Sequence, residues 1–382
     1  MTQANKQHSS PEWNPKGIGD PKRVDGFDLA RAFAVFGMIV VNFKIVMDAE
    51  SAGPAWLVWS LGLLDGRAAA TFVILAGVGI SLMSARARER GDSAAVARDR
   101  GTLFRRAIFL FVLGLMYTPL WPADILHFYG VYIALALFFL TTSMQRLLGA
   151  AAALTLIFMA LLLFLDYEAG WDWHTLSYQG FWTPSGLLRH LFFNGFHPVI
   201  PWLAFMLVGM ALGRIDLTDG KMRARVLQWS LPAAVLAEAA SWGLRQGLGS
   251  TDLFGAKKGN LLALIETNPM PPTMLYMVAA AGTAVTVVVL CVGLGMRFRD
   301  SKWLRPFVAT GQLALTLYVA HVVVGMGLLE AANRLKDQSL VFALSAASIF
   351  CVISVTFATL WKARFRHGPL EWVMRLATNP KA

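Results

Sequence analysis

Five polar residues inside or at the edge of four long apolar stretches are the parts of this chain best suited to chemistry. Asn42 lies in the first stretch, Asp124 and His127 stand three residues apart at the start of another, and His197 and His321 belong to two more. An imidazole accepts a proton near neutral pH, a carboxylate can orient it, and an amide can donate to a developing oxyanion. An acyl transfer to a hydroxyl or amine needs these groups.

A second set of charged residues could bind an anion. Asp28 and Arg31 are three residues apart, on one side of the first turns of an apolar stretch, and Arg105 and Arg106 precede another. Guanidinium groups bind phosphate well, so Arg31, Arg105 and Arg106 are candidates for holding a phosphate or pyrophosphate group. The simpler interpretation is a local ion pair with snorkelling side chains.

The first set also has simpler interpretations. A histidine within a membrane often only hydrogen-bonds a neighbouring helix, and Asn42 could join two helices in the same way. Asp124 could cap the N-terminus of a helix. The histidine spacing carries no metal-ligand signature, so we expect no metal site. We expect His190 and His367 to lie at the surface.

Membrane helices must position these residues. Hydrophobic residues make up 56% of the 382 residues and charged residues only 15%, and the apolar residues come in long blocks. We therefore predict an all-α, polytopic integral membrane helical bundle. About ten transmembrane helices are expected near residues 28–47, 68–83, 107–120, 125–146, 147–165, 197–212, 226–244, 274–296, 307–329 and 340–360.

The basic residues predict how these helices are oriented. Lys and Arg cluster in every second loop between the expected spans. The positive-inside rule puts these basic loops in the cytoplasm, and an even number of spans then makes both termini cytoplasmic. The expected organisation is a cytoplasmic N-terminal tail (1–26), a transmembrane domain (27–362) and a cytoplasmic C-terminal tail (363–382). The imidazoles and Asn42 then share an outer layer, while the arginines face the cytoplasm.

The net charge of +11 fits this topology better than it fits nucleic-acid binding. No basic stripe is interleaved with aromatic residues, so we expect anionic lipid headgroups and not nucleic acid as the charged partner. Gly77 and Gly79 in one span, and Gly209 and Gly213 in another, predict close helix packing. The two cysteines lie in apolar blocks and form no disulfide framework.

Several ordered segments carry a recognisable pattern. They are RVDGFDLARAFAVFGMIVVN ending at Asn42, PADILHFYG from Pro122, PVIPW with GMALGR ending at Arg214, GQLALTLYVAH ending at His321, and GPLEW from Gly368. They resemble, in order and over nearly the whole chain, the YeiB-like family (domain of unknown function 418). That family is similar to transmembrane acyltransferases, including the heparan-α-glucosaminide N-acetyltransferases and the acyltransferase-3 group.

The resemblance implies transfer of an acyl group from cytoplasmic acyl-CoA to an acceptor at the extracytoplasmic side. The spacing from Arg31 to Asn42 resembles the Arg-(ten residues)-His motif of the acyltransferase-3 group, with Asn in place of His as in the heparan-type enzymes. Those enzymes carry a catalytic histidine shortly after the first span, whereas this chain has none between His8 and His127. The expected base is then His321 or His197, with Asn42 as polar stabiliser and Arg31 on the CoA side.

Two other functions fit the same residues. In a transporter or permease for a small solute, the buried histidines and Asp124 would be proton or substrate sites. An export accessory protein would use none of them chemically. The resemblance further implies a multi-pass protein of the bacterial inner membrane, with membrane lipids, an acyl-CoA cosubstrate and a glycan or small-molecule acceptor as partners. A homodimer is also compatible with the sequence.

Overall fold

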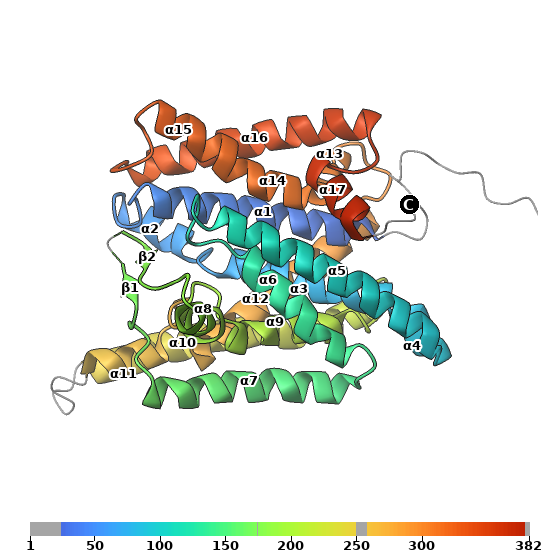
Figure 1. The fold of residues 1–382 in the computed structure, drawn as a ribbon, viewed down its shortest axis with the longest axis horizontal. Helices are drawn as coiled ribbons and strands as arrows, with labels where there is room; N and C mark the ends of the chain where they lie inside the picture. The colour runs from blue at the N-terminus through green and yellow to red at the C-terminus, as the bar shows by residue number, and fades with distance from the viewer. Residues whose placement is uncertain (1–23, 174, 250–257, 379–382) are drawn as a thin grey trace, which may run out of the picture.

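Long helices lying side by side make up most of the molecule (Figure 1). The structure, a computed structural model, describes residues 24–173, 175–249 and 258–378, so nearly all of the expected N-terminal tail lies outside the described residues. The elements in chain order are α1 (Asp25–Val46), α2 (Ala55–Gly62), α3 (Arg67–Met83), α4 (Ala85–Arg90), α5 (Ser93–Tyr117), α6 (Leu126–Ala136), η1 (Leu137–Phe139), α7 (Met144–Phe164), β1 (Trp171–Asp172), β2 (Ser177–Tyr178), α8 (Pro184–Arg189), η2 (His190–Asn194), α9 (Val199–Leu212), α10 (Gly220–Gly249), α11 (Lys258–Ile265), α12 (Met274–Arg297), α13 (Arg305–Gln312), α14 (Ala314–Ala320), η4 (His321–Met326), α15 (Gly327–Ala331), α16 (Leu340–Arg364) and α17 (Pro369–Thr378).

The predicted all-α membrane architecture is confirmed. Within the described residues, six helical segments are long and apolar enough to cross a membrane, and a pair bent by 49°, Pro184–Asn194 with Val199–Leu212, could form a seventh. The helix α6 is too short to count alone, and α5 and α10 begin with several basic residues. The count of ten spans and the orientation of the termini therefore stay predictions. The six segments are Asp25–Val46, Ala55–Met83, Met144–Phe164, Met274–Arg297, Ala314–Ala331 and Leu340–Arg364.

The bundle has two chemically different ends. One end, on the right in Figure 1, carries α4 and α17 and the loops rich in arginine and lysine, and we call it the basic end. The other end carries α8 and the short antiparallel pair of β1 and β2, and we call it the hairpin end. The helix α1 runs from the basic end to the hairpin end. It therefore connects the two predicted groups of functional residues.

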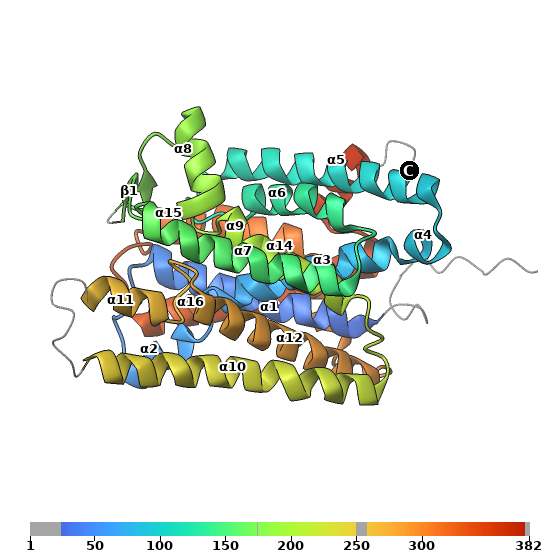
Figure 2. The ribbon, with the colours of Figure 1, turned by 90° about the horizontal axis from the view of Figure 1, so that it is seen from below.

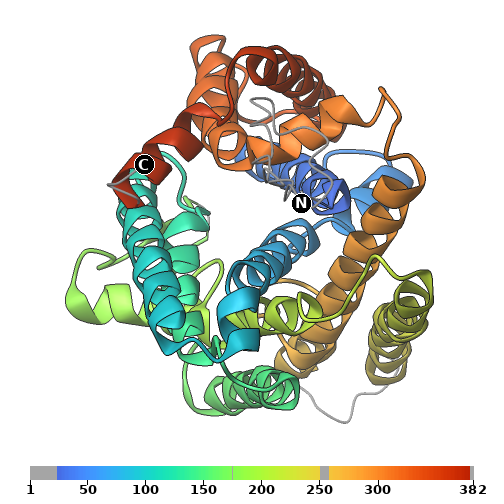
Figure 3. The same cartoon turned by 90° about the vertical axis from the view of Figure 1, so that its right-hand side faces the viewer.

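Close packing of α3 on α9 forms the centre of the bundle (Figure 3). A Cβ atom added to Gly77 would lie 2.1 Å from the Met206 carbonyl oxygen, and one added to Gly209 would lie 2.1 Å from that of Ile74. Gly213 is similarly crowded by Val78, so the packing predicted for these three glycines is confirmed. The prediction is wrong for Gly79, where an added Cβ would meet nothing within 4 Å, because this residue faces away from α9.

The C-terminal helix α17 is joined to the break between α13 and α14. The Glu371 carboxylate accepts the backbone N–H groups of Leu315 (2.8 Å) and Thr316 (3.1 Å) and the Thr316 hydroxyl (2.5 Å). These N–H groups belong to the first turn of α14, where no intrahelical acceptor exists. Burial raises the pKa of Glu371, and the hydrogen bonds from Thr316 oppose that effect. One side chain from α17 thus completes the start of α14.

We expect Glu371→Ala to lower the free energy of unfolding by about 1–3 kcal/mol, because it leaves buried backbone donors without an acceptor. The measurement is the thermal unfolding midpoint of the purified protein in detergent. The control is Glu330→Ala, which removes an exposed carboxylate from α15. Equal midpoints for both variants would show that Glu371 does not hold α14.

Candidate functional site

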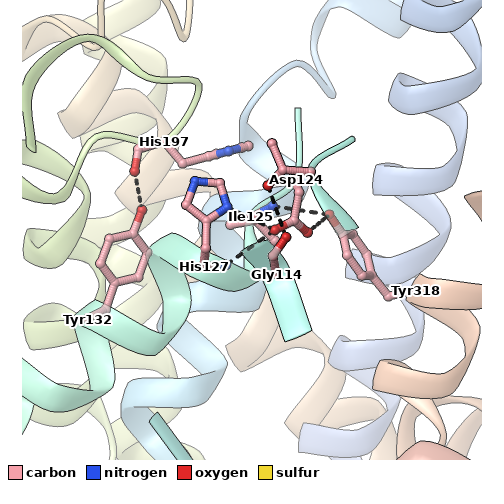
Figure 4. A network of polar contacts seen from close by, with 8 residues as sticks. Gly114, Asp124, Ile125, His127, Tyr132, His197 and Tyr318 are labelled. Carbon is pink, nitrogen blue, oxygen red and sulfur yellow. Dashed lines mark hydrogen bonds and ion pairs between the residues drawn. The ribbon is translucent and has the colours of Figure 1, made fainter. Parts of the chain in front are cut away.

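A buried carboxylate–imidazole pair stands at the start of α6 (Figure 4). Asp124 Oδ2 accepts the backbone N–H of His127 at 3.2 Å and its ring Nδ1–H at 3.0 Å, and both side chains are fully buried. Asp124 therefore satisfies a helix-start N–H, as the capping interpretation proposed, and orients the imidazole as well. Because Nδ1 carries the hydrogen, Nε2 presents its lone pair. That atom has no hydrogen-bond partner among the described residues.

Tyr318 on α14 connects this pair to a second one. Its hydroxyl donates to Asp124 Oδ1 at 3.3 Å and accepts the Ile125 N–H at 3.2 Å. Its carbonyl oxygen accepts a hydrogen bond from Nδ1 of His321. His321 Nε2 is then unprotonated and accepts from Asn42 Nδ2 at 2.9 Å. The structure thus joins α1, α14 with η4, and the start of α6 by one chain of hydrogen bonds.

Two further imidazoles lie near His127. His197 precedes α9 and packs edge-on against Trp202, with 4.6 Å between ring centroids, and its Nδ1 is buried without a partner in the described chain. His190 begins η2, and its ring centroid lies 5.7 Å from that of His127. The prediction that His190 lies at the surface is wrong, since its exposure is only 2%. The aromatic residues of the hairpin loop, including Trp171, pack around it.

Both π-helical segments in the described chain begin at a histidine of this region. They are η2, which begins at His190, and η4, which begins at His321. A π-turn is less favourable than an α-turn and is found often at functional sites, because it moves one side chain out of helical register. Each of these turns positions an imidazole against the polar chain described above.

A cavity of about 210 Å³, which we call the asparagine cavity, borders this polar chain toward the hairpin end. Asn42, His197 and Tyr318 line it, whereas His127 and His321 do not. On its opposite side Lys44 donates to both oxygens of Asp65, at 2.6 and 2.7 Å. The cavity therefore combines hydrogen-bonding groups of the predicted site with a partly buried ion pair that was not predicted from the sequence.

A second cavity, the arginine cavity, lies toward the basic end and has a volume of about 530 Å³. Arg31, Arg106 and Gln312 line it. Arg31 also lines a neighbouring cavity of about 660 Å³ together with Arg88 and Arg214, which we call the loop cavity. Three guanidinium groups thus surround the loop cavity, and one of them also reaches the arginine cavity.

The three predicted anion-binding arginines are placed differently. Arg31 forms the expected ion pair with Asp28, which uses one of its five N–H donors. Arg106 Nε is buried without a hydrogen-bond partner in the described chain. Arg105 instead donates from Nε to the Thr378 carbonyl oxygen at 2.7 Å and lines neither the arginine cavity nor the loop cavity. The structure thus brings Arg31 and Arg106 to one cavity and leaves Arg105 outside it.

Only a thin partition separates the asparagine and arginine cavities. Ile125 lines the first and Leu126, the next residue, lines the second. On α3 the change from one cavity to the other occurs between Ala69 and Phe72. Asp124 and His127 immediately precede and follow Ile125 and Leu126 in the sequence and stand beside the partition, although neither lines either cavity.

On α1, Arg31 and Asn42 point to one side of the helix. Eleven residues correspond to about three turns, so the two side chains share a face and lie about 16 Å apart along the axis. Each lines the cavity at its own end. This face of α1 therefore forms a continuous wall past the partition.

No role was predicted for Tyr318 from the sequence, although a signal was present. Tyr318 precedes His321 by three residues, which puts the two on one side of a helix. No group of three or more His, Cys, Asp or Glu side chains in the described residues has an arrangement that could hold a metal ion. The arrangement is suited to proton transfer between an oriented imidazole and a bound hydroxyl, amine or thiol.

Comparison with known proteins gives two family matches that together cover most of the chain. Residues 23–244 match the family model described as "Heparan-alpha-glucosaminide N-acetyltransferase, catalytic", and residues 250–381 match "Protein of unknown function (DUF418)". Among curated relatives, "Uncharacterized protein YxaH" of Bacillus subtilis (strain 168) is 23% identical over 94% of both chains. "Uncharacterized protein YeiB" of Escherichia coli (strain K12) is 22% identical over 92% of this chain and 95% of the relative.

We expect Gly114→Ala to destabilise the site. A Cβ at this position on α5 would lie 2.2 Å from the His127 backbone nitrogen and 2.8 Å from Asp124 Oδ2, and such overpacking costs about 1–3 kcal/mol. The measurement is the thermal unfolding midpoint in detergent. The control is Gly149→Ala on α7, where the added methyl group meets nothing within 4 Å. A Gly114→Ala midpoint equal to that of the control would contradict the close approach of α5 and α6.

Proposed function

Because the chain belongs to the YeiB-like (DUF418) family and matches the heparan-α-glucosaminide N-acetyltransferase catalytic model over residues 23–244, we propose that it is a membrane acyltransferase. The donor in this proposal is acyl-CoA from the cytoplasm, and the acceptor is a glycan or small molecule at the extracytoplasmic side. The observation that carries the proposal is the partition beside Asp124 and His127. It separates an arginine-lined cavity from a cavity lined by Asn42 and His197.

His127 is the base that the geometry favours. Its Nδ1–H is held by Asp124, and its Nε2 is free of partners among the described side chains. His321, by contrast, uses both ring nitrogens, through Tyr318 and Asn42. His197 lines the asparagine cavity, so it is the imidazole closest to the proposed acceptor. The proposal therefore makes His127 the base and keeps His197 as the alternative.

The reaction balances with these groups alone. The acceptor hydroxyl or amine attacks the thioester carbonyl carbon while His127 Nε2 takes the acceptor's proton. The new acyl–oxygen or acyl–nitrogen bond forms and the carbon–sulfur bond breaks. The imidazolium then returns the proton to the leaving thiolate, which gives free CoA. Asn42, held through its amide by His321, would donate to the oxyanion of the tetrahedral intermediate.

The arginines suit the phosphates of a CoA-type cosubstrate. Arg106 Nε is a buried donor with no partner in the described chain, and Arg31 keeps donors beyond the one that it gives to Asp28. Buried donors without acceptors are unfavourable, so an anion at this position would stabilise the site. CoA would supply the activated thioester. The residues of the arginine cavity would bind and orient it.

The proposed topology has about ten spans, with both termini in the cytoplasm of a bacterial inner membrane. The helices α5 and α10 lie parallel to helices that are long and apolar enough to cross a membrane (Figure 2). This orientation supports counting α5 and α10 as spans. The ends of α3, α9 and α12 and the start of α10 lie at the basic end, as the positive-inside rule requires for a cytoplasmic face. Arg31 would then contact the acyl-CoA donor from the cytoplasm, and Asn42 would contact the acyl acceptor at the extracytoplasmic side.

A small-solute transporter is the second candidate function, because two cavities with a thin partition would also serve alternating access. In that case Asp124 and His127 would carry protons and the arginine cavity would have no preference for CoA. Binding of CoA separates the two functions.

We expect the purified protein to bind CoA, and Arg31→Ala and Arg106→Ala to weaken the binding roughly 10- to 100-fold, since each removes charged hydrogen bonds. Calorimetry with CoA in detergent measures this. The control is Arg299→Ala, which removes an exposed arginine from the basic end. Failure of the unaltered protein to bind millimolar CoA would remove the acyltransferase proposal and favour the transporter.

We expect His127→Ala to reduce acyl transfer roughly 10²- to 10⁴-fold, the contribution typical of a general base. The measurement is the release of CoA thiol from acetyl-CoA in proteoliposomes, with glucosamine as the trial acceptor. His367→Ala is the control, because this histidine lies near α17 and outside the site. Full activity of His127→Ala with loss of activity in His197→Ala would move the base to His197.

A further inference from the structure

A long apolar groove lies on the side of the bundle, apart from the proposed reaction site. It runs between α7 and α10, with α9 and α12 as its floor, and its volume is about 1160 Å³. Both walls are peripheral helices, α7 and α10 (Figure 3). Ala152, Leu156, Trp229 and Val285 are among the lining residues. The groove therefore opens toward the hydrocarbon of the membrane.

The middle of the groove offers almost nothing to a polar ligand. The hydroxyl groups of Ser230 on α10 and Thr286 on α12 hydrogen-bond each other at 2.9 Å. Thr155 on α7 also lines the groove, and its hydroxyl donates to the Ala151 carbonyl oxygen at 3.1 Å. The other residues that line this part are apolar. A ligand in this region must therefore be apolar.

The end of the groove at the basic end is different, because two arginines and one carboxylate line it. Arg225 is exposed, and Arg214 donates to the Thr142 carbonyl but has a buried Nε without a partner among the described residues. Asp216 accepts the Thr218 hydroxyl at 2.6 Å and its N–H at 2.9 Å, which holds the pKa of that carboxyl below its usual range. This end of the groove thus carries a net positive charge and can bind an anion.

The α7 wall of the groove is about as long as one membrane leaflet is thick. This wall extends from Met144 to Leu156, which is about 18 Å at the rise of an α-helix. One leaflet of the hydrocarbon core is about 15 Å thick, whereas a spanning helix crosses about 30 Å. The α7 wall therefore matches the acyl chains of one leaflet.

We propose that this groove is a binding site for one phospholipid with an anionic headgroup. The acyl chains lie against α9 and α12, and the phosphate lies beside Arg225 and Arg214. The lipid comes from the leaflet at the basic end. This site does not depend on the proposed acyl transfer, since it shares no lining residue with the asparagine or arginine cavity.

The test uses Trp229 as a reporter in nanodiscs of the full-length protein. A phosphatidylglycerol or a phosphatidylcholine with brominated acyl chains is added at increasing mole fraction, and bromine quenches tryptophan on contact. The Trp229 signal is the difference between the unaltered protein and Trp229→Phe. We expect half-quenching at a lower mole fraction of phosphatidylglycerol. The preference is measured as the ratio of the two mole fractions at half-quenching. Arg225→Gln should lower this ratio by about fivefold, which is the effect of one arginine at an anionic membrane surface.

A matched pair of variants separates the groove from ordinary lipid contact. Ala152 lines the groove and Ala153, the next residue on α7, does not. Ala152→Phe should abolish the preference for phosphatidylglycerol by filling the groove, and Ala153→Phe should leave it unchanged. Equal quenching by both lipids in the unaltered protein, or an unchanged preference in Ala152→Phe, would overturn the proposal. Protection of Trp229 from both lipids would also overturn it and would indicate a second copy on this face.

Discussion

The whole arrangement depends on one constraint: polar groups inside a hydrocarbon layer must have partners. A buried carboxylate or imidazole without a hydrogen bond is costly, so such groups gather. Here Asp124, His127 and Tyr318 form one connected chain with His321 and Asn42, contributed by three different parts of the bundle. Each helix is thereby fixed in rotation and in depth relative to the others. A single misplaced helix would leave several buried groups unsatisfied.

The same constraint makes the exceptions informative. The buried nitrogens of His127, His197 and Arg106 lack partners among the described residues, although they lie beside or near cavities. Their hydrogen-bonding capacity is available to a ligand. The two His nitrogens belong to the region of the partition and the Arg106 nitrogen to the arginine cavity. These three atoms are thus divided between the proposed acceptor side and the proposed donor side.

Much of the architecture could be predicted from the sequence, because long apolar blocks allow few alternatives in a membrane. The grouping of Asn42 with His321 followed from their depth in two spans, and the structure brings them within 2.9 Å. The helix α2 (Ala55–Gly62) was not predicted. It precedes α3 with a break of only a few residues, and the span predicted at 68–83 covers α3 alone.

Predictions failed where the rotation of a helix decides which way a side chain points, or where a segment distant in the sequence buries a residue. Arg105 and Arg106 are neighbours, but about 100° of helical rotation sends one to Thr378 and the other to the arginine cavity. His190 was expected at the surface because it belongs to a loop region. The aromatic hairpin that buries it is a tertiary contact that no local pattern indicates. Tyr318 was overlooked because a tyrosine in a span is usually packing.

The central claim is that a thin partition at the start of α6 separates two cavities that open to opposite sides of the membrane. The most direct test places one cysteine on each side of it along α3, Ala69→Cys and Ala76→Cys, in a protein whose Cys291 and Cys351 are replaced by serine. A small charged methanethiosulfonate reagent is then added to right-side-out or inside-out membrane vesicles. The account predicts reaction of Ala69→Cys only from the extracytoplasmic side and of Ala76→Cys only from the cytoplasmic side. Reaction of both cysteines from the same side, or of either from both sides, would contradict it.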